Sequence, residues 1–126
     1  AEMGKKLNKI TDSKRYSIKA AQIKKVYNEK LFDSNTAIYS LGSQTSMAIP
    51  LSMNMVDNSY REKVLANLVD SINANDKKLT AGDIGFHYLI EALTEENQSQ
   101  LVYDMNNRND VPGYGYQIKK GATSLT

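Results

Sequence analysis

Apolar side chains recur along most of this chain at the spacing of helices rather than strands. Between Ser13 and Leu31 they return every three or four residues, and lysines fill most of the other positions. This pattern predicts an amphipathic helix. The segment from Gln44 to about Met55 is apolar on most sides, which is typical of a helix surrounded by protein. Pro50 lies inside that segment and is expected to bend it or to end its first part.

Three further helices are predicted from the same kind of pattern. Ser59 and Glu62 have the spacing of a capping box and precede a long apolar run, so a helix should begin there. The stretch from Ile84 to Leu93 is densely apolar and predicts a second buried helix. Thr94 is a candidate N-cap for a shorter helix that ends near Asn106.

A repeat of 40 and 39 residues joins these helices into pairs, because Gly42, Gly82 and Gly121 each end a loop and precede an apolar helix. Each unit is a hairpin with a charged outer helix and an apolar inner helix. An open solenoid of the HEAT type and a closed ring of hairpins both have this pattern. The loops Tyr39 to Gln44 and Pro112 to Gly121 contain glycine and tyrosine and enter inner helices. They favour the ring, with a binding funnel at that end.

Composition excludes several classes of function. The chain has 126 residues, 40% hydrophobic and 24% charged, which is the size and composition of one globular domain. No apolar stretch approaches the roughly 18 residues of a membrane span. With no cysteine and one histidine, neither a metal site nor a cofactor is expected. Nine of the sixteen Lys and Arg residues fall in the first thirty positions, but no aromatic residues are interleaved to stack on bases, so nucleic acid is not an expected partner.

The most specific motif is the run PGYGYQIKKGATSLT at residues 112–126. It resembles the segment of bacterial α-L-rhamnosidases that reads proline, a small residue, an aromatic residue, Gly-Tyr, a spacer and Gly-Ala-Thr-Thr. The runs LTAGDIG at 79–85 and GSQT at 42–45 are similar to that family's entries to the two preceding inner helices, in the same order and spacing. The resemblance covers about residues 32–126, whereas 1–31 matches only as a generic outer helix.

This resemblance implies an all-α fold in which residues 1–126 form the truncated, C-terminal part of a catalytic domain, about half of an (α/α)6 barrel of the six-hairpin glycosidase type. It further implies an inverting hydrolase of terminal α-L-rhamnosides, with a carboxylic acid that protonates the leaving oxygen and a carboxylate base that activates water. In inverting enzymes these two groups stand roughly 6.5 to 9.5 Å apart. The base is expected just after Thr126 and the acid well upstream, so the chain contains no catalytic residue and is expected to be inactive alone.

Four residues are candidates for binding the carbohydrate substrate, a rhamnose-containing glycan or glycoside. Tyr114 and Tyr116 can stack on a sugar ring, with loop packing as the alternative. Asp83 can bind sugar hydroxyls from the entry of its helix, where a role as N-cap is equally suited. His87 lies one turn later, and a buried structural histidine is the alternative there.

Three nearby acids, Glu91, Glu95 and Glu96, are interpreted as structural, because acids in the first turn of a helix favour its dipole. Asp83 and His87, together with Leu125-Thr126, depart from what many members of the family carry, so the bond cleaved could differ from a rhamnoside.

Other interpretations remain open. A HEAT-like interaction module, and another glycosidase on the same ring such as a glucosidase or trehalase type, are the alternatives. Half a ring would expose the apolar faces of its inner helices, which predicts self-association to a dimer or larger species. The compartment stays undetermined, with a secreted or periplasmic bacterial parent as one alternative.

Overall fold

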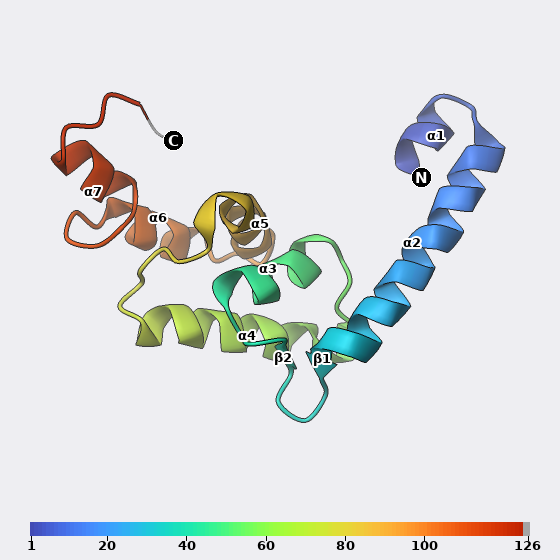
Figure 1. Ribbon diagram of the computed structural model, residues 1–126, viewed down its shortest axis with the longest axis horizontal. Coiled ribbons are helices and arrows are strands. Elements are labelled where there is room, and N and C mark those ends of the chain that lie inside the picture. Colours follow the sequence, from blue (N-terminus) through green and yellow to red (C-terminus); the bar gives the residue numbers. More distant parts are fainter. Residues whose placement is uncertain (125–126) are drawn as a thin grey trace. The chain divides into compact units, whose positions relative to one another are not determined.

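The computed structural model describes residues 1–124, and the chain divides into two compact units, Ala1–Phe32 and Asp33–Thr126. We call them the N-terminal unit and the hairpin unit. The N-terminal unit consists of α1 (Glu2–Lys6) and α2 (Ile10–Leu31), drawn in blue to cyan in Figure 1. The amphipathic helix predicted from Ser13 is therefore confirmed. The backbone of Gly4 lies against Ser13, since a Cβ atom added at Gly4 would be 3.1 Å from the Ser13 Cα atom.

The hairpin unit contains the remaining elements. In chain order they are β1 (Phe32–Asp33) at the junction, β2 (Ile38–Tyr39), α3 (Gln44–Ser52), α4 (Asn58–Ala74), α5 (Gly82–Glu95), α6 (Ser99–Asn107) and α7 (Tyr114–Lys119). The strands β1 and β2 form a two-stranded sheet. None of the helices in the described part of the chain is long and apolar enough to cross a membrane.

The core of the hairpin unit lies where α3 packs against both α5 and α4 (Figure 1). Helix α3 buries residues on most of its surface, whereas α4 buries a single stripe of Val64, Leu68 and Ile72. Leu89 and Leu93 of α5 are also fully buried. Apolar inner helices and a one-faced outer helix are thus confirmed, and burial of these side chains is the main stabilising contribution.

The three glycines of the repeat share one backbone conformation. Gly42, Gly82 and Gly121 have φ angles of +69°, +67° and +87°, in the left-handed region that side chains with a Cβ atom rarely adopt. The 40-residue repeat is therefore a repeat of structure at α3 and α5, because the chain turns in the same way before both helices. The inner helix predicted after Gly121 is not among the elements of residues 1–124, and its continuation lies outside the described residues.

Helix boundaries differ from the predictions in several places. Ser43 caps α3 as expected, since its hydroxyl oxygen accepts a hydrogen bond from the Ser46 N–H. The predicted capping box at Ser59 is wrong, because α4 already begins at Asn58 after Asp57. Thr94 is not an N-cap either, because α5 continues through it to Glu95.

Two proline-containing segments also differ in detail. Helix α3 continues through Pro50 and ends at Ser52, short of the boundary predicted near Met55. The segment from Pro112 to Gly121 was expected to be a loop, but it contains the helix α7. The glycines suggested a loop, but at Gly115 the glycine serves close packing against the end of α6. A Cβ atom added there would lie 2.5 Å from the Arg108 carbonyl oxygen.

Candidate functional site

The run GSQT ties the start of α3 to the entry of α5. Gln44 is only 4% exposed, and its amide makes two hydrogen bonds. Its Nε2 donates to the Lys78 carbonyl oxygen at 2.8 Å, and its Oε1 accepts from the Thr80 N–H at 2.9 Å. The position of the backbone that leads to α5 therefore depends on this one buried side chain.

Thr45 extends the same contact into the helices. Its hydroxyl donates to the Ala81 carbonyl oxygen at 2.6 Å. A Cβ atom at Gly85 would overlap Thr45 Oγ1 and lie 2.9 Å from Thr45 Cβ, so only glycine allows α5 to approach α3 this closely. The two upstream runs that carry the family resemblance are thus contact surfaces between neighbouring inner helices.

A hollow of about 560 Å³ opens beside α5, between that helix, α6 and the start of α7. Its lining residues are Asp83, Phe86, His87, Ile90, Val102, Tyr103, Asn106 and Tyr114. Three of the four predicted binding residues, Asp83, His87 and Tyr114, therefore line one cavity. An adjoining hollow of about 240 Å³ shares Asp83 and Tyr114 and adds Gln117.

The alternatives given for Asp83 and His87 are wrong. Asp83 is exposed in the first turn of α5, whose N-cap is Ala81 and has no side-chain hydrogen bond. His87 is exposed rather than buried, with its ring edge-on to Tyr88 at a centroid distance of 5.4 Å. Both side chains are available to a ligand.

The two tyrosines differ in their surroundings. Tyr114 packs its ring edge-to-face on Phe86, with centroids 5.4 Å apart, which fixes it at the wall of the hollow. Tyr116 lies outside that lining, and Lys120 Nζ is 5.4 Å from the centre of its ring. Sequence reasoning missed Phe86, Tyr103 and Asn106, because apolar spacing on a helix indicates burial without indicating which face a neighbouring helix leaves open.

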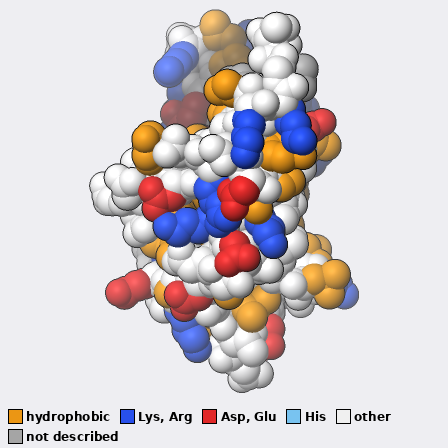
Figure 2. Space-filling view, turned by 90° about the vertical axis from the view of Figure 1, so that its left-hand side faces the viewer, with side chains coloured by type: hydrophobic (Ala, Val, Ile, Leu, Met, Phe, Trp, Pro, Cys, Tyr) orange, Lys and Arg blue, Asp and Glu red, His pale blue; other side chains and the backbone are white. Residues whose placement is uncertain are grey.

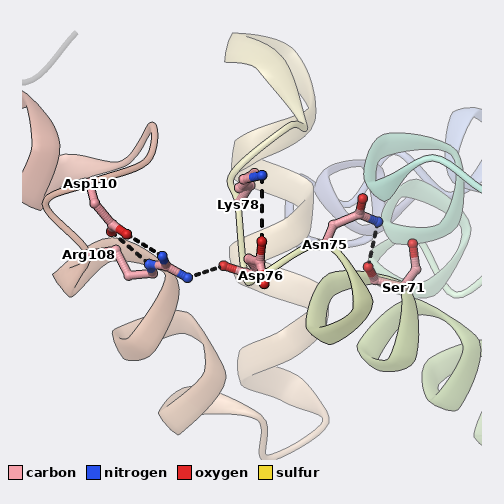
Figure 3. Close-up of polar contacts among 6 residues, drawn as sticks. All are labelled: Ser71, Asn75, Asp76, Lys78, Arg108 and Asp110. Carbon is pink, nitrogen blue, oxygen red and sulfur yellow. Dashed lines mark hydrogen bonds and ion pairs between the residues drawn. The ribbon is translucent and has the colours of Figure 1, made fainter.

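The loops before α5 and α7 are joined by polar contacts (Figure 3). Arg108, at the end of α6, donates from Nε to Asp110 Oδ1 at 2.9 Å and from Nη2 to the second carboxylate oxygen. Its Nη1 donates to the Asp76 carbonyl oxygen at 2.5 Å. The hydrogen bond from Arg108 lowers the pKa of Asp110 to about 2, and the same bond raises the pKa of Arg108.

A second tie joins the same loop to α6. Lys77 Nζ lies 2.6 Å from Asp104 Oδ2, and Gln100 Nε2 donates to Asp104 Oδ1 at 2.8 Å. The hydrogen bond from Lys77, followed by that from Gln100, lowers the pKa of Asp104. Figure 2 shows basic and acidic side chains interspersed at the centre of the face that lies to the left in Figure 1.

Two of the three acids interpreted as structural, Glu91 and Glu96, make contacts with other helices, but the reason expected from the sequence is wrong. They lie in or just after the last turns of α5, where the helix dipole does not favour acids. Glu96 instead pairs with Arg61 of α4, Nε to Oε1 at 2.5 Å, with side chains 22% and 24% exposed. Glu91 accepts a hydrogen bond from Ser52 of α3. No group of three or more potential metal ligands occurs among residues 1–124.

The inner helices α3 and α5, entered through left-handed glycines and paired with outer helices, are common to open solenoids and closed rings of hairpins, and a family comparison separates the two. The matching family model is described as the bacterial α-L-rhamnosidase six-hairpin glycosidase domain, and it matches residues 1–126. The chain belongs to this family, which decides between the ring of hairpins and the open HEAT-type solenoid in favour of the ring.

Individual relatives agree with this assignment. An α-L-rhamnosidase of Streptomyces avermitilis is 28% identical over 125 residues, which is 99% of this chain and 12% of the relative. Among solved structures, the α-L-rhamnosidase of Dictyoglumus thermophilum is 32% identical with a TM-score of 0.88, over 98% of this chain and 14% of that one. A Streptomyces avermitilis α-L-rhamnosidase solved with L-rhamnose is 27% identical with a TM-score of 0.90, over 98% and 12%. The chain therefore spans about an eighth of the length of these relatives.

Proposed function

We propose that this chain is part of the catalytic barrel of an inverting α-L-rhamnosidase that hydrolyses terminal α-L-rhamnosides. The observation that carries the proposal is the family match over the whole chain, in which three candidate binding residues line one hollow. The catalytic acid and base are proposed to lie outside residues 1–126. Inversion requires a water between the base carboxylate and the sugar, while the acid protonates the leaving oxygen. The chain is proposed to contribute part of the wall of this site.

The chemistry of the larger hollow supports sugar binding. At about 560 Å³ it falls in the range of small-ligand sites, roughly 300 to 1,000 Å³. The ring of Tyr114, held by Phe86, offers an apolar face to the C–H side of a sugar ring. The Asp83 carboxylate would accept hydrogen bonds from sugar hydroxyls, and His87 would donate or accept one. Tyr116, beside the hollow, is proposed to extend the stacking surface.

The binding proposal is tested by titrating the purified chain with L-rhamnose and following ligand signals by NMR. Asp83→Asn should weaken binding about tenfold or more, because hydrogen bonds to a charged group contribute about 1.5 to 3 kcal/mol. Tyr114→Ala should weaken it through loss of the stacking face. Asp70→Asn removes an exposed carboxylate on α4 and serves as the matched control, with no expected change. Equal affinity of Asp83→Asn and the control variant would contradict the assignment.

Catalysis by the isolated chain is not expected, because the acid and base are proposed to lie elsewhere. Incubation with an aryl α-L-rhamnoside should release no aglycone above the buffer rate. Measurable turnover by the purified chain would overturn the placement of the catalytic carboxyl groups outside it.

Self-association is proposed for the purified chain on the basis of exposed apolar side chains in its hairpin unit. Ile84 of α5 is 79% exposed, although one repeat earlier the equivalent Gln44 is almost fully buried. Tyr103 and Ile118 are 61% and 65% exposed. Apolar surface of this kind favours association. Light scattering should give the mass of a dimer or a larger species, and a monomer at all concentrations would contradict the proposal.

A further inference from the structure

The two walls of the larger hollow are carried by separate segments of the chain. Asp83 and Phe86 lie on α5 and follow the loop from Asn75 to Ala81, whereas Tyr114 follows the loop after α6. The width of the hollow between these walls therefore depends on how the two loops are held relative to each other. Among the contacts described for residues 1–124, one side chain reaches both loops.

That side chain is Arg108. Its Nη1 donates a hydrogen bond to the Asp76 carbonyl oxygen in the first loop, while Nε and Nη2 donate to the Asp110 carboxylate in the second (Figure 3). Its own carbonyl oxygen lies against Gly115, at 2.5 Å from the position of an added Cβ atom. The start of α7 thus packs against the backbone of Arg108, and the guanidinium of the same residue contacts the first loop.

The first loop, from Asn75 to Ala81, contains an energetically unfavourable backbone conformation. Asp76 and Lys77 are consecutive non-glycine residues with φ angles of +54° and +56°, a conformation that costs free energy and persists only where surrounding contacts over-determine it. The contacts come from both sides. Arg108 and Asp104 hold the loop from α6, and Gln44 holds its end from α3 through Lys78 and Thr80.

The geometry points to Arg108 as a positioning residue for the hollow, one that fixes the separation of Asp83 and Tyr114 without touching the sugar. The inference rests on the proposed function for its consequence in binding. Planarity of the guanidinium is required, because it donates to a carboxylate and a carbonyl oxygen at the same time through a rigid fork. A lysine ammonium carries the same charge and lacks this fork.

The test compares Arg108→Lys with Arg15→Lys in the purified chain. Arg15 is exposed on α2 and lies over the Tyr16 ring, so it supplies the same chemical change where neither loop is involved. Three quantities are measured: amide exchange in residues 76–80, the aromatic NMR resonance of Tyr114 assigned through Tyr114→Phe, and the Kd for L-rhamnose. Exchange at α5 core amides such as Leu89 verifies that each variant is folded.

For Arg108→Lys we expect faster exchange in residues 76–80, a shifted Tyr114 resonance and a Kd raised roughly five- to tenfold. Asp110→Asn keeps the hydrogen bond to Asp76 and weakens the grip on the second loop, so a smaller change in the same direction is expected. If the α5 core amides of Arg108→Lys lose their slow exchange, that variant is not folded, and Asp110→Asn is used in its place. Arg15→Lys should change none of the three quantities.

The possible results separate the two proposals. If Arg108→Lys leaves loop exchange and the Tyr114 resonance unchanged, the positioning role is overturned. It is equally overturned if both change while the Kd for L-rhamnose does not. If the unmodified chain binds no L-rhamnose but Arg108→Lys still moves the Tyr114 resonance, the link between the walls is supported and the proposed ligand of the hollow is rejected.

Discussion

The N-terminal unit and the hairpin unit are both built from helices with regular apolar spacing, yet only one of them has a core. In the N-terminal unit, all of which is described, Ser13 is the only buried residue, and Ile18, Ile23 and Val26 of α2 are more than half exposed. In the hairpin unit Leu68 and Leu89 are completely buried. The difference shows that regular apolar spacing predicts a helix without predicting whether its apolar face is covered, and most of the stability of helices in proteins comes from that covering.

The most direct way to test this contrast is to shorten one buried and one exposed side chain. Leu89→Ala removes a fully buried side chain from α5 and should lower the free energy of unfolding by about 2 to 5 kcal/mol. Ile23→Ala, at a position 53% exposed, should change it by less than about 0.5 kcal/mol. Urea unfolding at a fixed protein concentration measures both. Similar losses for the two variants would mean that α2 has a covered apolar face in solution.

A smaller effect is expected from adding a methyl group where α3 and α5 meet. Gly85→Ala would overlap the Thr45 side chain, displace it from the Ala81 carbonyl oxygen, and cost about 1 to 3 kcal/mol. In the N-terminal unit the comparison variant is Ala21→Gly, at an exposed helix position. It should lower the free energy of unfolding by about 1 kcal/mol through helix propensity alone. Adding Thr45→Ala to Gly85→Ala should recover part of the loss. Strict additivity of the two changes in urea unfolding would argue against the contact.

Gln44→Leu tests the polar part of the same junction. The change keeps the size of the side chain but leaves the Lys78 carbonyl oxygen and the Thr80 N–H without their partner. Both residues are on the surface, so water replaces part of the interaction and a loss of about 1 kcal/mol is expected, at the low end for unpaired buried groups. Hydrogen exchange should accelerate at Thr80, whereas the amides of α2 should not respond. Faster exchange in α2 would indicate that Gln44 acts beyond the hairpin unit.

Helix existence and the hairpin repeat could be predicted from the sequence because they depend on local spacing and on glycine. Left-handed glycines at positions 42, 82 and 121 are the physical basis of the repeat, and no other residue adopts that conformation as easily. Helix ends were less predictable. Thr94 has the side chain of an N-cap, yet packing of α5 against α3 carries the helix past it to Glu95.

The candidate site could be predicted only in part, for a similar reason. Asp83 and Tyr114 are separated by a whole hairpin in the sequence and share a hollow because α6 returns the chain to α5. Spacing within one helix cannot indicate that return. Arg108 and Asp110 illustrate the same point, because their charge and loop position do not indicate that the carbonyl oxygen of Asp76 completes the contact.

The smallest expected effect is the response to acid of the two loops of the hairpin unit that Arg108 connects. Asp110 has its pKa lowered from 3.8 to about 2 by the hydrogen bond from Arg108, so folding favours its ionised form. A group whose pKa is lowered by folding stabilises the folded state above its unfolded pKa and ceases to do so as pH falls through the folded value. The grip of Arg108 should thus be unchanged from neutral pH to about 4 and should weaken between about 4 and 2.

Amide exchange in residues 76–80, corrected for the intrinsic pH dependence of exchange, measures this weakening. Asp110→Asn cannot ionise and is the matched control, so its loop should show a smaller response over the same interval. Lys77 and Gln100 also lower the pKa of Asp104, which leaves some acid sensitivity in the control and makes Asp104→Asn the next variant to combine with it. Identical acid responses in the unmodified chain and in Asp110→Asn would mean that the loops are held from the α3 side, by Gln44, more firmly than from α6.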